Sequence, residues 1–152
     1  MRISKHISYK EAVHSATAKR RGIENTPNEE QLYAMNNVAE FIFEPLRLYV
    51  GGAIKINSFY RSKEVNQAVG GSVRSQHCKG QAIDIDDVFG HKTNFEMFEY
   101  IRENLDFDQL IYEFGTNDNP DWVHVSYVSK KENRNRVLRA IRENGKTRYE
   151  IY

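Results

Sequence analysis

The stretch SQHCKGQAIDID (residues 75–86) joins a polar, glycine-containing loop to a short strand. From residue 81 onward apolar and polar residues alternate, so that Ile83 and Ile85 share one face while Asp84 lies on the other, because successive side chains of a strand point to opposite sides. The isoleucines predict a face packed on a core. A carboxylate on the opposite face is costly to bury without a partner, which indicates a cleft or a bound ion there.

A second stretch, WVHVSYV (residues 122–128), has the same character, with Val123 and Val125 on one face and His124 on the other. His77 lies in the loop before the first strand, from which its side chain can reach the same cleft. Two imidazoles and one carboxylate suit zinc, which favours tetrahedral N, O and S ligands and in catalytic sites takes three of them from the protein and one from water. These residues therefore suggest a metal site.

The first clear helix begins near residue 26. Thr26 suits the N-cap, Pro27 the first helical position and Glu29 the capping-box partner. Apolar residues then recur at helical spacing, and Pro45 is expected to kink or end this helix near Glu44.

The rest of the chain predicts shorter elements around these two strands. In chain order they are a strand over 53–60, a helix from Ser62 to Gly70, a helix from Asn94 to about Leu105, a strand over 109–114, and a hairpin over about 136–152 around Asn144-Gly145. Helices interspersed with such strands predict an α+β fold, with helices packed on a central, mostly antiparallel sheet.

Length and composition restrict the class of protein. A chain of 152 residues fits one domain, 1–152, and its 39% hydrophobic and 28% charged residues are typical of a globular protein. The net charge of +1 argues against a nucleic-acid binder, and no apolar run approaches the roughly 18 residues needed to cross a membrane. The N-terminus shows no Sec-type signal, so synthesis in the cytoplasm is expected. A single cysteine, Cys78, excludes an internal disulfide.

Three segments together resemble a known family. Residues 75–84, from Ser75 through His77 to Asp84, are similar to the S-x-H-x-x-G-x-A-x-D motif of the zinc D-Ala-D-Ala carboxypeptidase family, which has the Hedgehog/DD-peptidase fold. The segment DWVH (121–124) resembles that family's second motif, and SFYRS (58–62) resembles the segment that supplies an arginine to its active site. Residues 9–127, about three quarters of the chain, resemble the compact branch found in phages and bacteria.

The resemblance implies a zinc site with one ion per chain, held by His77, Asp84 and His124. It implies Asp121 as the general base, at a position where many relatives have the longer glutamate. A general base must lie within hydrogen-bonding distance of the attacking water. Because aspartate is one methylene shorter than glutamate, either the carboxylate lies further from the water or the strand shifts toward it.

The resemblance also implies residues that bind the substrate. Arg61 would bind a substrate carboxylate or polarise the carbonyl that is attacked, and Ser75 would hydrogen-bond the substrate terminus. Glu113 is a further acid near the site, interpreted either as a group that orients a histidine or as a surface residue.

The implied function is a metallopeptidase that degrades the cell wall by cutting peptidoglycan stem peptides. It would act as a carboxypeptidase at D-Ala-D-Ala or as an L-Ala–D-Glu endopeptidase of the endolysin kind. A non-catalytic zinc-binding or virion module of the same fold is the other alternative, and the presence of Asp121 and Arg61 favours the enzyme. A monomer is favoured, without nucleic-acid or membrane partners, that reaches the wall by phage-type release or as part of a virion.

Overall fold

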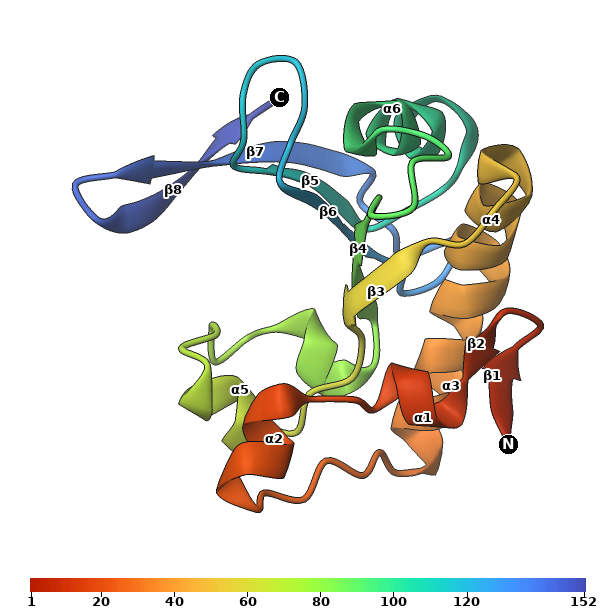
Figure 1. Cartoon of the computed structure of the whole chain (residues 1–152), viewed down its shortest axis with the longest axis vertical. Coiled ribbons are helices and arrows are strands. Elements are labelled where there is room, and N and C mark those ends of the chain that lie inside the picture. Colours follow the sequence, from red (N-terminus) through yellow and green to blue (C-terminus); the bar gives the residue numbers. More distant parts are fainter.

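A six-stranded sheet organises the protein, seen here in a computed structural model that describes residues 1–152 (Figure 1). In order across the sheet the strands are β3 (Lys55–Ser58), β4 (Ala82–Asp86), β6 (Trp122–Ser126), β5 (Gln109–Glu113), β7 (Arg136–Glu143) and β8 (Lys146–Ile151). All neighbours pair antiparallel except β5 and β7, which are parallel. The prediction of an α+β fold with a mostly antiparallel sheet is confirmed.

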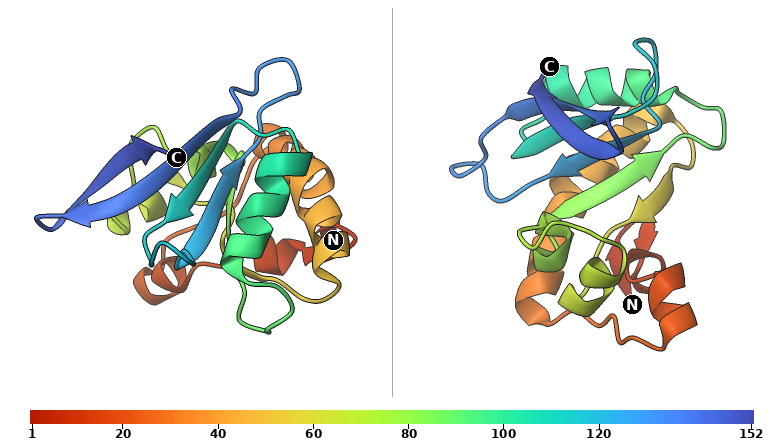
Figure 2. Two further views of the ribbon diagram at one scale, coloured as in Figure 1. Left: turned by 90° about the horizontal axis from the view of Figure 1, so that it is seen from above. Right: turned by 90° about the vertical axis from the view of Figure 1, so that its left-hand side faces the viewer.

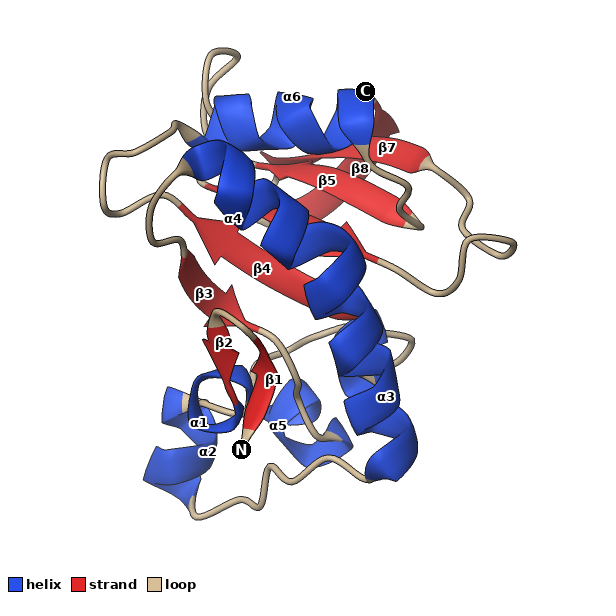
Figure 3. Ribbon diagram, turned by 90° about the vertical axis from the view of Figure 1, so that its right-hand side faces the viewer, coloured by secondary structure: helices blue, strands red, loops and turns tan.

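The long helices cover one face of this sheet (Figure 3). They are α3 (Glu29–Val38), the π-helix η1 (Ala39–Phe43) and α4 (Glu44–Val50), which form one helical run, and α6 (Asn94–Asn104). Apolar side chains of β4, β5 and β6 meet these helices in the main core, among them Ile83, Ile85, Leu110, Tyr112, Val123, Val125, Met35, Ile42, Phe98 and Ile101. Because neighbours on a strand alternate, the opposite face of the sheet carries Asp84 and His124.

Short elements lie beside the β3 edge of the sheet (Figure 1). They are β1 (Arg2–Ser4), β2 (Ile7–Ser8), α1 (Tyr9–Ala12), α2 (Ala16–Arg21), α5 (Lys63–Ala68) and the 3-10 helix η2 (Gln76–Lys79). The four elements before residue 22 were not predicted, because none exceeds 6 residues and so none displays a clear period. None of the helices has both the length and the apolar character needed to cross a bilayer.

The start of the long helical run differs from the prediction. Asn28 is the N-cap: its side chain accepts a hydrogen bond from the Gln31 backbone N–H, and the Gln31 side chain accepts one from the Asn28 backbone N–H. Thr26 and Pro27 therefore precede the helix, and Glu29 is not the capping-box partner. The reason is that asparagine caps at least as well as threonine, and here the side chains of Asn28 and Gln31 each satisfy one backbone donor of the other residue.

Of the two outcomes predicted for Pro45, a kink or the end of the helix, the end near Glu44 is wrong, because the helical run continues past it. Proline lacks an N–H and crowds the carbonyl four residues earlier. The wider π-helical turn η1 comes directly before it, with the Glu44 N–H bonded to the carbonyl of Ala39, five residues back. The helical run consequently continues to Val50 and ends at Gly51, which adopts the left-handed conformation with φ 76°.

Asn94 has a different role from the predicted N-cap of α6. Thr93 caps this helix and forms a capping box with Glu96. The Asn94 side chain instead donates to Asp86 Oδ1 at 2.8 Å and to the backbone carbonyl of Asp121 at 3.1 Å. It thereby ties α6 to the end of β4 and the start of β6, the two strands that carry the predicted metal ligands.

The C-terminal hairpin forms as predicted and extends the sheet past the other strands (Figure 2). Its turn residues Asn144 and Gly145 have φ of 53° and 75°, the left-handed pair that a type I′ turn requires. The outer strand β8 is exposed along its length. The hairpin is therefore held to the rest of the molecule mainly through the parallel pairing of β7 with β5.

Candidate metal centre and catalytic cleft

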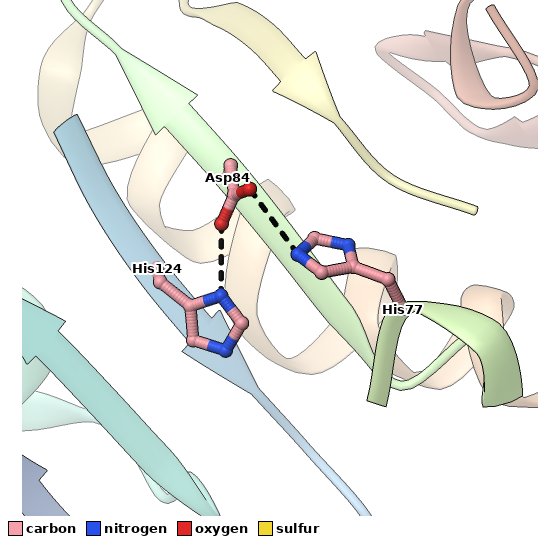
Figure 4. Close-up of side chains that lie close together, drawn as sticks. All are labelled: His77, Asp84 and His124. Carbon is pink, nitrogen blue, oxygen red and sulfur yellow. Dashed lines mark hydrogen bonds and ion pairs between the residues drawn. The ribbon is translucent and has the colours of Figure 1, made fainter. Parts of the chain in front are cut away.

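His77, Asp84 and His124 meet in space, as the sequence predicted. Asp84 and His124 are direct partners in the antiparallel pairing of β4 and β6, and His77 approaches from η2. Figure 4 shows a ring nitrogen of each histidine pointing at one oxygen of Asp84: His124 Nδ1 lies 2.8 Å from Oδ1 and His77 Nε2 lies 3.2 Å from Oδ2. One ligand atom from each residue lies within 4.8 Å of the other two.

The hydrogen bonds of His77 fit a metal ligand. Its Nδ1 lies 2.7 Å from the carbonyl oxygen of Phe59, which only accepts, so Nδ1 carries the hydrogen and donates. In the neutral ring Nε2 then presents a lone pair. This atom is buried and has no hydrogen-bond partner, although it faces the carboxylate of Asp84. Two electron-rich groups this close call for a cation between them, and N/O donors of this kind suit a divalent metal.

The charge state of Asp84 agrees with this arrangement. Burial by itself would raise the pKa of its carboxyl, but the positive charge that His77 carries when its imidazole is protonated, together with the hydrogen bond from His124, outweighs burial and holds the pKa far below its usual range. A positive charge beside Asp84, whether from a protonated histidine or from a metal ion, therefore favours the ionised carboxylate that metal binding requires.

A cleft of about 880 Å³ opens over these three residues. One of its walls comes from residues 61–79, which include Arg61 before α5 and Ser75 before η2, and the other comes from β5, β7 and β8. The Nε atom of Arg61 is buried without a hydrogen-bond partner. Ser75 Oγ accepts from the His77 backbone N–H at 3.2 Å, so this side chain also shapes the turn that carries the first ligand.

Glu113 lies in the same cleft. In the pairing of β5 with β6, Ile111 is opposite His124 and Glu113 is opposite Trp122, which places Glu113 on the face that carries His124. Its side chain is 7% exposed, so the interpretation as a surface residue is wrong, and it forms no hydrogen bond with either histidine. Burial raises the pKa of this carboxyl to about 7, opposed by His124 and reinforced by Asp84. Glu113 is thus an acid that exchanges a proton near neutral pH.

Asp121 lies at the entrance to β6 and is exposed. Its backbone N–H donates to the Glu113 carbonyl at 2.9 Å, and its own carbonyl accepts from Asn94. The residues that line the cleft include Trp122, the first residue of β6, but not Asp121. The structure therefore brings Arg61 and Ser75 into the cleft with the three predicted ligands, while a catalytic role of Asp121 stays a prediction.

The Peptidase M15 family model matches residues 5–126 of the chain, which include every predicted site residue. The chain belongs to the Peptidase M15 family. Its members are metallopeptidases, so the resemblance noted in the sequence is confirmed at the level of family and general chemistry. No individual curated protein matches the chain. The match ends before the β7–β8 hairpin, which lines one side of the cleft.

An ion pair between the buried Asp108 and the exposed Arg134 supports the loop that carries His77 in this M15 peptidase. Asp108, which is 2% exposed, accepts from Arg134 Nε at 2.9 Å and Nη2 at 2.7 Å, and from Gln76 Nε2 at 2.9 Å. Gln76 directly precedes His77, so the network ties η2 to the start of β5 and to the segment before β7. Sequence reasoning assigned no role to these three residues, because they are far apart in the chain and no periodic pattern links them.

Replacing the Asp108 carboxylate is expected to destabilise the M15 peptidase. Arg134 holds the pKa of Asp108 below its usual range. The stabilisation of the fold by the ionised carboxylate is therefore present above pH ~4 and is lost as the pH falls through the lowered pKa of Asp108. Asp108→Asn should lower the free energy of unfolding by about 1–3 kcal/mol at neutral pH. The effect is expected toward the lower end of this range, because Arg134 is exposed and solvent screens its charge. Urea unfolding near neutrality and near pH 3 measures both the loss and its decrease in acid. Asp106→Asn, at an exposed neighbour, is the control; an equal loss in both variants would contradict the assignment.

Proposed function

We propose that this chain is a zinc metallopeptidase that hydrolyses peptidoglycan stem peptides as a D-Ala-D-Ala carboxypeptidase. The observation that carries the proposal is the meeting of the His77, Asp84 and His124 ligand atoms at a cleft that also holds the unpartnered Arg61 guanidinium. Zinc is proposed because the donor set is two imidazoles and one carboxylate. A carboxypeptidase is favoured because a guanidinium with an unsatisfied buried N–H suits the terminal carboxylate of a peptide.

The residues divide the chemistry between them. When bound, zinc would supply a Lewis acid that polarises the peptide carbonyl and favours ionisation of water. Arg61 would bind the terminal carboxylate and so place the last peptide bond over Asp84. We propose Asp121, by its motif position three residues before His124, as the group that takes the proton from the attacking water and returns it to the leaving amine. Glu113 is another acid, which lies within the cleft, and its pKa, raised to about 7 by burial, suits a proton acceptor.

Incubation with defined muropeptides followed by mass spectrometry tests this function. Loss of one alanine from pentapeptide stems supports the carboxypeptidase. Release of the stem between L-Ala and D-Glu would identify an endopeptidase on the same substrate instead. Muropeptides left intact by zinc-loaded protein would overturn the proposal and favour a zinc-binding module without activity.

A further inference from the structure

Positive charge is concentrated in the cleft, although the chain as a whole is nearly neutral at +1. Two acids line the cleft, Asp84 and Glu113, and Asp84 is engaged by the two histidines. The cationic side chains that line it are Arg61, Arg74, Lys79, Arg134, Arg136 and Arg142. Of these six, only Arg134 takes part in an ion pair, with Asp108. The cleft therefore presents five cationic groups that have no anionic partner within the chain.

Two of these unpaired arginines stand on the hairpin beyond the matched family region. In the parallel pairing of β5 with β7, Ile111 is opposite Leu138 and Glu113 is opposite Ala140. Side chains at every second position of β7 thus continue the face of the metal centre, and Arg136 and Arg142 lie at the two ends of that row.

The hairpin also holds one of these arginines in place. The guanidinium carbon of Arg142 lies 4.4 Å from the centroid of the Phe114 ring, a cation–π contact that leaves the planar N–H edge available to a ligand. Thr147 is the strand partner of Arg142 on β8, and both residues line the cleft. Arg142 follows Ala140 by two residues, so its backbone lies about 7 Å along the strand from the level of Glu113.

We propose that Arg142 and Arg136 provide two separate carboxylate-binding positions of one extended subsite, and that this subsite selects acidic peptides. The proposal rests on the proposed peptidase function, because the peptide must present a carbonyl at Asp84 while its other carboxylates reach the hairpin. Guanidinium groups pair with carboxylates through two parallel N–H···O bonds. The two arginines are six residues apart, about 20 Å along an extended strand. That separation suits an extended peptide several residues long that crosses the metal centre.

The probes are L-Ala-γ-D-Glu-L-Lys-D-Ala-D-Ala and the same peptide with the α-carboxyl of D-Glu converted to an amide. Trp122 is the only tryptophan and lines the cleft, so its fluorescence reports binding to the zinc-loaded chain. We expect the acidic peptide to bind about tenfold or more tightly than the amide at low salt. In the Arg136→Gln/Arg142→Gln double variant this preference should disappear, while the amide binds as before.

Arg148→Gln is the matched control. Arg148 is on the same hairpin but pairs with Ile141, does not line the cleft, and contacts Glu143 and Glu150. Its variant should keep the wild-type preference. Equal affinities of the wild type for the two peptides, or a preference that survives in the double variant, would overturn the subsite. Charge-dependent binding without cleavage of either peptide would leave the subsite standing and overturn the proposed peptidase function alone.

Discussion

Asp84→Asn is expected to remove both the bound metal and the hydrolytic activity. Asp84 is the residue on which both histidines converge, through Oδ1 to His124 and through Oδ2 to His77. An amide retains the size of the side chain but loses the negative charge, so the two imidazoles face each other without a compensating anion. The loss in metal affinity should exceed the roughly 10–100-fold that follows removal of an outer-shell partner. Hydrolysis should fall to background.

Elemental analysis of protein purified without chelator measures this directly. The wild type should contain about one zinc per chain, and Asp84→Asn should contain almost none, with an unchanged circular dichroism spectrum. Asp86→Asn is the matched control: it lies on the same strand, and its side chain accepts a hydrogen bond from Asn94, which an amide oxygen also accepts. Wild-type protein without stoichiometric metal, or a variant that keeps it, would contradict the assignment of the centre.

The meeting of Asp84 with His124 was predictable because its pattern is local to each strand. Alternation in residues 81–86 and 122–128 placed Asp84 and His124 on polar faces, and the burial of Ile83 and Val123 against the helices forces that orientation. A slip of one residue would turn the isoleucines toward the cleft, so the core itself sets the register that pairs Asp84 with His124.

Features that depend on long-range contacts escaped prediction. The Phe59 carbonyl that orients His77 is a backbone atom, and any residue at that position would supply it. Asp108 and Arg134 meet only because the chain returns to β5 after β6. The position of the hairpin beside the cleft follows from the parallel pairing of β5 and β7, and a turn motif such as Asn144-Gly145 carries no information about that pairing.

The second large effect is expected at Asp121, the acid that we propose as the acceptor of the proton from the attacking water. Asp121→Asn should keep the metal and lower kcat by roughly 10²–10⁴-fold, the range associated with loss of a general base. The reason is that Asn keeps the shape of the side chain, and with it the backbone contacts of Asp121 to Glu113 and Asn94, but cannot accept the proton. Steady-state kinetics on a muropeptide, with bound zinc measured in the same samples, separates this effect from loss of the centre.

Glu113→Gln and Asp118→Asn make this experiment decisive. Asp118 is an exposed acid in the loop before β6, and its variant should resemble the wild type. Glu113 is the alternative proton acceptor, because its buried carboxyl lies in the cleft on the face of His124 and its pKa is raised to about 7. A 10²–10⁴-fold loss in Glu113→Gln, with Asp121→Asn close to the wild type, would transfer the proton-accepting role from the motif residue to Glu113.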